Sequence, residues 1–189
     1  MTFSDRSSGR YREPVTPNPF LLEIFHTGWA NHQDYLLAAL SDLRPEQLAL
    51  RTAPQAWAIW QIAGHIAGSR AFWFHDVLGE GDPAVRNIFR VVRTTVPDLP
   101  LEDAGWEDDE TRPRSASEIV DALERTWAVI DGCLRTWTLD DLAVGFPRSG
   151  YDGMTTRAWV IWHLIEHDAH HGGAISLILG SHGLPGLDV

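Results

Sequence analysis

Apolar residues recur at helical spacing in four stretches of the chain, and helix-breaking residues separate these stretches. The first stretch covers about residues 20–43 and carries Leu21, Ile24, Phe25, Trp29, Tyr35, Leu36 and Leu40. Apolar side chains three or four positions apart form one stripe along an α-helix. Asn18-Pro19 marks a plausible start of this helix and Arg44-Pro45 a plausible end, because proline is unsuited to a helix interior.

The other helical stretches cover about residues 58–78, 117–137 and 157–179. Glycines follow the first and the last of them, as is common beyond helix ends. Ser115 or Ser117 is a suitable N-cap for the third helix, and Thr155 or Thr156 for the fourth. Four amphipathic helices without a convincing sheet predict an all-α fold, an up-and-down four-helix bundle with one long crossover connection.

The connections between these helices are less regular. For residues 83–114 we expect a solvated loop with one short helix near Ala84 to Val92, although connections of this length are often functional. Residues 138–153 form a second connection, in which Phe146 and Tyr151 would pair in a small hairpin. Residues 1–19 lack the apolar middle of a secretory signal, so we expect a flexible N-terminal segment followed by one domain over residues 20–189.

Composition narrows the classes of function. The formal net charge is −11, and no basic stripe is visible, so a nucleic-acid partner is not expected. No apolar run approaches the roughly 18 residues that span a bilayer. The single cysteine cannot form an internal disulfide, which suits a reducing cytoplasm. All 15 basic residues are arginines, so lysine Schiff-base chemistry is excluded.

Histidines supply the strongest chemical signal. His163, His167 and His171 are spaced four residues apart and therefore share one face of the last helix. Two imidazoles at this spacing can hold one metal ion, and a third ligand must come from another helix. His65 lies among small and apolar residues of the second helix, and a histidine in the interior needs a partner. Together these histidines favour a divalent metal site.

Each histidine also has a simpler interpretation. His65 alone would more often be a hydrogen-bonded core residue, and two histidines one turn apart can arise by chance in a histidine-rich helix. The segment His163-x-x-Glu166-His167 also matches the motif of inverted zinc peptidases, in which Glu166 would be the general base. That motif needs a further glutamate ligand on another helix downstream, and the only acid after the last predicted helix is Asp188. A ferritin-like di-iron site needs Glu-x-x-His, and this spacing is not met.

Several short motifs resemble one known family. They are Trp57-Ala-Ile-Trp60 leading to Gly64-His65, Trp106 followed by acidic residues, Pro113, and His163-x-x-Glu166-His167-x-x-His170-His171-x-Gly173. On these residues the chain resembles the DinB/YfiT-like family of metal-binding proteins over about residues 20–185. The resemblance implies a four-helix bundle with one zinc, nickel or similar ion held by His65, His167 and His171. It places His163 one turn away from the metal.

The resemblance also suggests a class of reaction. Some relatives are S-transferases or isomerases that use a low-molecular-weight thiol such as bacillithiol or mycothiol, so we expect a metal-dependent enzyme of this type. A metal-dependent hydrolase and a non-catalytic, metal-stabilised binding protein are the alternatives. Trp57 and Trp106 are candidates for the pocket wall. Glu166 and Asp168 would either orient a histidine or be solvated acids. The resemblance points to a homodimer, and we expect it to act on a small-molecule substrate in the cytoplasm, the compartment that the single cysteine suits.

Overall fold

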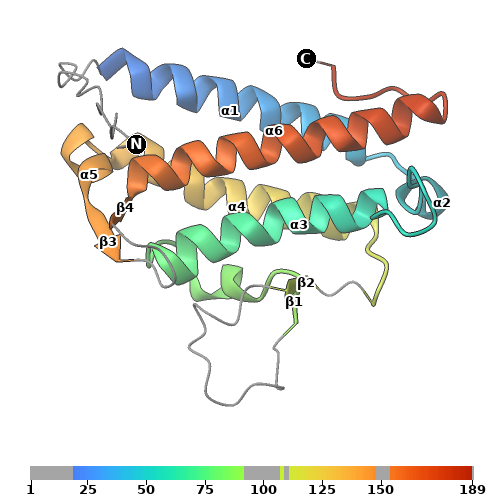
Figure 1. Cartoon of the computed structure of the whole chain (residues 1–189), viewed down its shortest axis with the longest axis horizontal. Helices are drawn as coiled ribbons and strands as arrows, with labels where there is room; N and C mark the ends of the chain where they lie inside the picture. The colour runs from blue at the N-terminus through green and yellow to red at the C-terminus, as the bar shows by residue number, and fades with distance from the viewer. Residues whose placement is uncertain (1–18, 92–106, 109–110, 148–153, 189) are drawn as a thin grey trace, which may run out of the picture.

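The computed structural model describes residues 19–91, 107–108, 111–147 and 154–188, and most of these residues are helical. Its long helices lie side by side along the molecule (Figure 1). They are α1 (Pro19–Leu40), α3 (Ile59–Ala71), α4 (Ala116–Thr136) and α6 (Arg157–Ser181). Helix α3 packs against both α4 and α6, and α1 packs mainly against α4. No helix in these ranges is both long and apolar enough to cross a membrane.

Short elements join the long helices. Helix α2 (Pro45–Leu48) follows α1, and the π-helix η1 (Phe72–Val77) continues directly from α3. The 3₁₀-helix η2 (Pro83–Asn87) precedes strand β1 (Arg90–Val91), which pairs antiparallel with β2 (Glu107–Asp108). Helix α5 (Leu139–Ala143) precedes an antiparallel hairpin of β3 (Gly145–Pro147) and β4 (Met154–Thr156).

The connections are therefore more structured than the sequence pattern predicts. The described part of the chain is mostly helical, as expected, and adds two short antiparallel strand pairs. The expected helix near Ala84 to Val92 ends at Asn87, because Phe89 adopts a left-handed φ of 54° and the chain then enters β1. The expected hairpin exists, but Phe146 lies opposite Thr155, and Tyr151 lies outside the described residues. So do residues 1–18 of the expected flexible segment, whereas residue 19 opens α1.

Side-chain caps fix where two of the long helices begin. The Ser115 hydroxyl accepts a hydrogen bond from the Glu118 amide, and the Glu118 carboxylate accepts one from the Ser115 amide, which makes a capping box. The Ser115 amide, the Arg112 side chain and the Ser115 hydroxyl together lower the pKa of Glu118 to about 2. At α6 the Thr156 hydroxyl accepts a hydrogen bond from the Trp159 amide at 3.2 Å. Ser115 and Thr156 are thus the caps among the predicted candidates.

The apolar core forms two clusters. One contains Leu36, Leu40, Ile119, Leu123 and Ile175, and the other contains Trp29, Phe74, Ile130, Val160 and Leu164, each with further neighbours. Buried polar residues lie near the boundary between the two clusters. We call four of them, one from each long helix, the buried polar layer: Gln33, Arg70, Thr126 and Asp168. Burial of polar groups costs free energy unless they find partners, so their contacts bear on function.

Candidate metal centre

Helices α3 and α6 bring three histidines together. His65 lies on α3, and His167 and His171 lie one turn apart on α6; each offers one ring nitrogen, and these nitrogens lie within 4.8 Å of one another. The Nε2 atoms of His65 and His167 are 2.9 Å apart. The ring of His171 is centred 4.8 Å from that of His65 and 4.4 Å from that of His167. We call these three partly buried residues the histidine cluster.

The donor chemistry of the histidine cluster fits a divalent cation. Two ring nitrogens at 2.9 Å can share only one hydrogen, whereas a cation can accept the lone pairs of all three rings. Three imidazoles with an open fourth position are common at catalytic zinc sites, and imidazole ligands also suit nickel. Burial, followed by the neighbouring His167, His65 and His170, lowers the pKa of His171 to about 3. His171 is therefore neutral at pH 7, as a metal ligand must be.

His163 and His170 lie outside the histidine cluster. The His163 ring stacks on Trp159 at 4.9 Å and meets the edge of Trp73 at 5.2 Å, and its centre is 6.1 Å from that of His167. His170 is exposed beside His171. Of the predicted stripe, His167 and His171 meet His65, whereas His163 lies among aromatic rings. Among the described residues, the group of side chains that could hold a metal ion includes His65, His167 and His171 but not His163. Glu166, the general base of the inverted peptidase motif, is exposed.

Other groups border the histidine cluster. The Trp57 ring is centred 4.9 Å from His65 and 6.3 Å from His171, so this candidate pocket residue lies against the site. Trp60 is buried in the core, and Trp106 lies outside the described residues. The Ser69 hydroxyl is 3.3 Å from His167 Nε2. Nothing in the sequence pattern singled out Ser69, so this contact was missed.

Asp168 is not a solvated acid. It is completely buried, and its Oδ2 accepts hydrogen bonds from Trp29 Nε1 at 2.6 Å and Arg70 Nε at 2.8 Å. Burial alone would raise the pKa of Asp168, but the Arg70 charge and the hydrogen bonds outweigh burial and hold the pKa below its usual value. Arg70 also donates to Gln33 Oε1 at 2.7 Å. Sequence reasoning missed this network, although one arginine inside the otherwise uncharged run of residues 59–74 was a usable signal.

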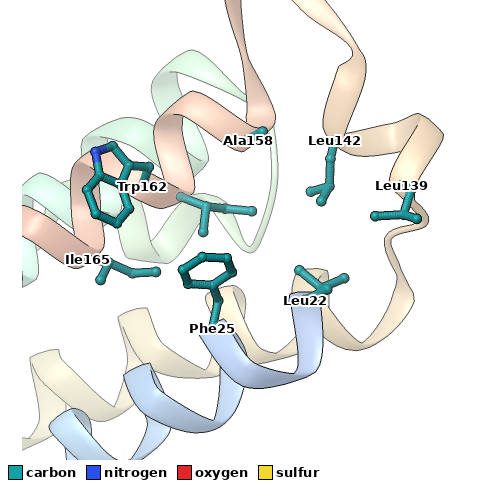
Figure 2. Close-up of a pocket in the computed structure, with 8 residues that line it drawn as sticks. Leu22, Phe25, Leu139, Leu142, Ala158, Trp162 and Ile165 are labelled. Atoms are coloured by element: carbon teal, nitrogen blue, oxygen red, sulfur yellow. The ribbon is translucent and has the colours of Figure 1, made fainter. Parts of the chain in front are cut away.

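A separate apolar hollow of about 210 Å³ lies where α1, α5 and the first half of α6 meet. Figure 2 shows its lining side chains converging from the three helices. The lining residues are Leu22, Phe25, Leu139, Leu142, Ala158, Ile161, Trp162 and Ile165. Phe25 and Trp162 remain 43% and 56% exposed, which is unusual for such large apolar side chains. None of the lining residues can titrate or bind a metal, so the hollow is distinct from the histidine cluster.

Comparisons with known proteins agree with this architecture. The sequence profile of the DinB superfamily matches residues 11–175. The fold is similar to that of a DinB-like protein from Bacillus cereus, with 21% identity, a TM-score of 0.64, and coverage of 88% of this chain and 96% of that chain. It is also similar to a conserved protein from Enterococcus faecalis, with 13% identity, a TM-score of 0.59, and coverage of 85% and 98%. No curated protein matches significantly.

Proposed function

The chain belongs to the DinB superfamily, and from that premise we propose that it is a metal-dependent enzyme that uses a low-molecular-weight thiol in a transferase or isomerase reaction. The observation that carries the proposal is the histidine cluster, in which two helices bring three ring nitrogens within 4.8 Å. His65, His167 and His171 would hold one divalent ion, zinc or nickel. Three neutral ligands would leave its full charge and at least one open position.

The chemistry required of such an ion is simple. It would act as a Lewis acid that lowers the pKa of a thiol cosubstrate and so favours the nucleophilic thiolate. The histidines bring one ring nitrogen each within 4.8 Å of the others, and Trp57 would supply an apolar wall beside them. An electrophilic small molecule could then be attacked beside this wall.

The thiol must come from outside the chain. Cys133 is the only cysteine, and it is buried in the second apolar cluster. Burial and the nearby Glu80 raise the pKa of Cys133 to about 12, so almost none of it is thiolate near neutral pH. A thiol-dependent reaction at this site therefore needs a separate thiol molecule.

Two other functions use the same histidine cluster. A metal-dependent hydrolase would activate water instead of a thiol, and a non-catalytic protein would keep the ion for stability alone. We prefer the thiol-dependent reaction because the family resemblance suggests it. In addition, the described residues near the histidine cluster do not include an obvious general base.

The decisive experiment has two steps. Protein purified without added metal should contain close to one divalent ion per chain by elemental analysis. It should then couple low-molecular-weight thiols to electrophilic substrates, lose this activity on chelation, and regain it with zinc or nickel. Chelation-sensitive hydrolysis without a thiol would support the hydrolase instead. A protein that neither contains nor takes up zinc or nickel would refute all three functions.

We further propose that the scaffold is the up-and-down four-helix bundle with one crossover, that two copies form a twofold homodimer, and that the protein acts in the cytoplasm. The apolar hollow is a suitable surface for the second copy. Exposed Phe25 and Trp162 would be covered there, and an apolar contact avoids bringing charges together between chains of net charge −11. The single cysteine agrees with a reducing compartment.

A further inference from the structure

The two ring nitrogens of His167 face different surroundings. Its Nε2 lies on the side of the histidine cluster, 2.9 Å from His65 Nε2 and 3.3 Å from the Ser69 hydroxyl. Its Nδ1 lies on the other side, 3.7 Å from Asp168 Oδ1. Both Nδ1 and Oδ1 are buried, and neither makes a hydrogen bond within the described residues. Two unpaired buried polar atoms this close need only a small shift to pair with each other.

The Asp168 carboxylate is held firmly from the other side. Its Oδ2 accepts hydrogen bonds from Trp29 on α1 and from Arg70 Nε on α3, and a second Arg70 nitrogen lies 2.7 Å away as an ion-pair contact. Trp29, Arg70 and Asp168 are at most 2% exposed. Because the Oδ2 partners come from two other helices, the carboxylate cannot rotate freely, and Oδ1 is left directed toward His167.

We propose that Asp168, clamped by Arg70 and Trp29, is a positioning residue that orients the His167 ring for metal binding. Accepting the hydrogen from Nδ1 fixes the tautomer in which the Nε2 lone pair points into the histidine cluster. Metal-binding histidines commonly donate their second ring nitrogen to a carboxylate in this manner. The inference rests on the proposed metal site. It assigns the orienting role to Asp168 rather than to Glu166, whose side chain is exposed.

A purely structural role for the ion pair is the competing explanation, because the buried polar layer also divides the two apolar clusters. The two roles differ in what they predict for metal affinity. A structural role ties any loss of affinity to loss of folding stability. A positioning role lowers the affinity of protein that is fully folded.

The test compares Asp168→Asn with Ile130→Ala as a control for lost stability. Ile130 is a fully buried core residue on α4 and takes no part in the network around Asp168. Metal-free protein is titrated with Zn²⁺ against a competing chelator, and helicity is checked for each variant. We expect Asp168→Asn to bind Zn²⁺ about 10–100-fold more weakly than wild type, as for other lost partners of ligating histidines. Ile130→Ala should keep the wild-type affinity.

A spectroscopic readout reports geometry directly. With Co²⁺ as the probe, the visible absorption bands should change position in Asp168→Asn and stay unchanged in Ile130→Ala, since only the first alters the orientation of a ligand. If folded Asp168→Asn binds Zn²⁺ as wild type does and shows the wild-type Co²⁺ bands, the positioning role is refuted.

Asp168→Asn leaves Arg70 buried without an anionic partner, which destabilises the fold, so a second variant is needed. The double variant Arg70→Met/Asp168→Leu removes both charges, a change that is often tolerated at buried ion pairs. The same loss of Zn²⁺ affinity in this folded double variant supports the positioning role, and wild-type affinity overturns it. Wild-type protein that binds neither Zn²⁺ nor Ni²⁺ would refute the proposed function itself, before any variant is compared.

Discussion

Helix α6 carries two neighbouring regions that are built in opposite ways. Its first half borders the apolar hollow, where every lining residue is apolar and Phe25 and Trp162 stay partly exposed. Further along, α6 carries His167, Asp168 and His171, which face polar partners on α3 and α1. In the hollow, apolar surface is left uncovered, whereas around Asp168 charged groups are fully covered and paired.

The contrast between the apolar hollow and the polar surroundings of Asp168 indicates where chemistry is to be expected on this scaffold. An apolar surface can exchange one neighbour for another at modest cost, because hydrophobic contact has little directionality. A buried polar group needs a partner at one distance and angle, so its surroundings are fixed. This difference agrees with the roles proposed above, in which the histidine cluster holds an ion and the hollow receives a second copy of the chain.

The largest effect should come from removing a member of the histidine cluster. His171→Ala should abolish metal binding, because only two imidazoles and solvent would remain. His163→Ala is the matched control from the same stripe and should lose no more than about 10–100-fold in affinity, as for residues beside a ligand. Metal content and dissociation constants, with helicity checked, decide between them. Loss of metal in His163→Ala but not in His171→Ala would reopen the inverted peptidase reading.

The second largest effect concerns the contribution of the buried Arg70–Asp168 ion pair to folding stability. Arg70→Met leaves Asp168 buried without its ion-pair partner and should lower the free energy of unfolding by about 3–5 kcal/mol. Arg135→Met is the control, because Arg135 pairs with Asp131 at the surface and is 65% exposed. Its loss should leave the free energy of unfolding nearly unchanged. Urea unfolding measures both, and equal effects would contradict the special cost of the buried pair.

The third effect tests whether the apolar hollow is the interface between two copies of the chain. Trp162→Ser should shift the proposed homodimer toward monomer, because it removes a large exposed side chain from the rim of the hollow. Leu177→Ser is the control on the same helix, since Leu177 is 66% exposed but does not line the hollow. Light scattering at micromolar concentration gives the mass of each. A monomeric wild type, or a Trp162→Ser variant that remains dimeric, would exclude this surface as the interface.

The smallest effect concerns the thiol of Cys133, which is buried in the second apolar cluster. Alkylation of Cys133 at pH 8 should be much slower in the folded protein than in urea, because only the thiolate reacts and the pKa of Cys133 is raised to about 12. The rate in the folded protein should rise as the pH approaches that value. Mass spectrometry of samples quenched over time gives both rates. Rapid labelling of folded protein would show that the second apolar cluster opens readily.

The sequence predicts those features that depend on local spacing. Helical periodicity located the long helices, and four-residue spacing placed His167 and His171 on one face. His65 required a further step, since nothing local says which helix lies opposite. The family resemblance and the interior character of its neighbours supplied that step.

Features that depend on distant partners were harder to predict. Asp168 and Arg70 are 98 residues apart, and no spacing rule links an acid on one helix with an arginine on another. The sequence therefore left Asp168 equally open to a solvated role. Likewise, the chain passes from η2 to β1 through the left-handed backbone at Phe89. Phenylalanine rarely adopts this conformation, so the sequence did not predict it. A structure is needed wherever the outcome depends on which segments meet.

The distance along the chain between the members of the histidine cluster also has a kinetic meaning. His65 and His167 are 102 residues apart, so their rings meet only after a long loop has closed and α3 has docked on α6. Contacts of such long range are generally formed late in folding. High-affinity capture of a metal during refolding would then report the final docking step rather than early helix formation. Stopped-flow refolding with a metal-sensitive signal beside far-ultraviolet circular dichroism would separate the two events in time.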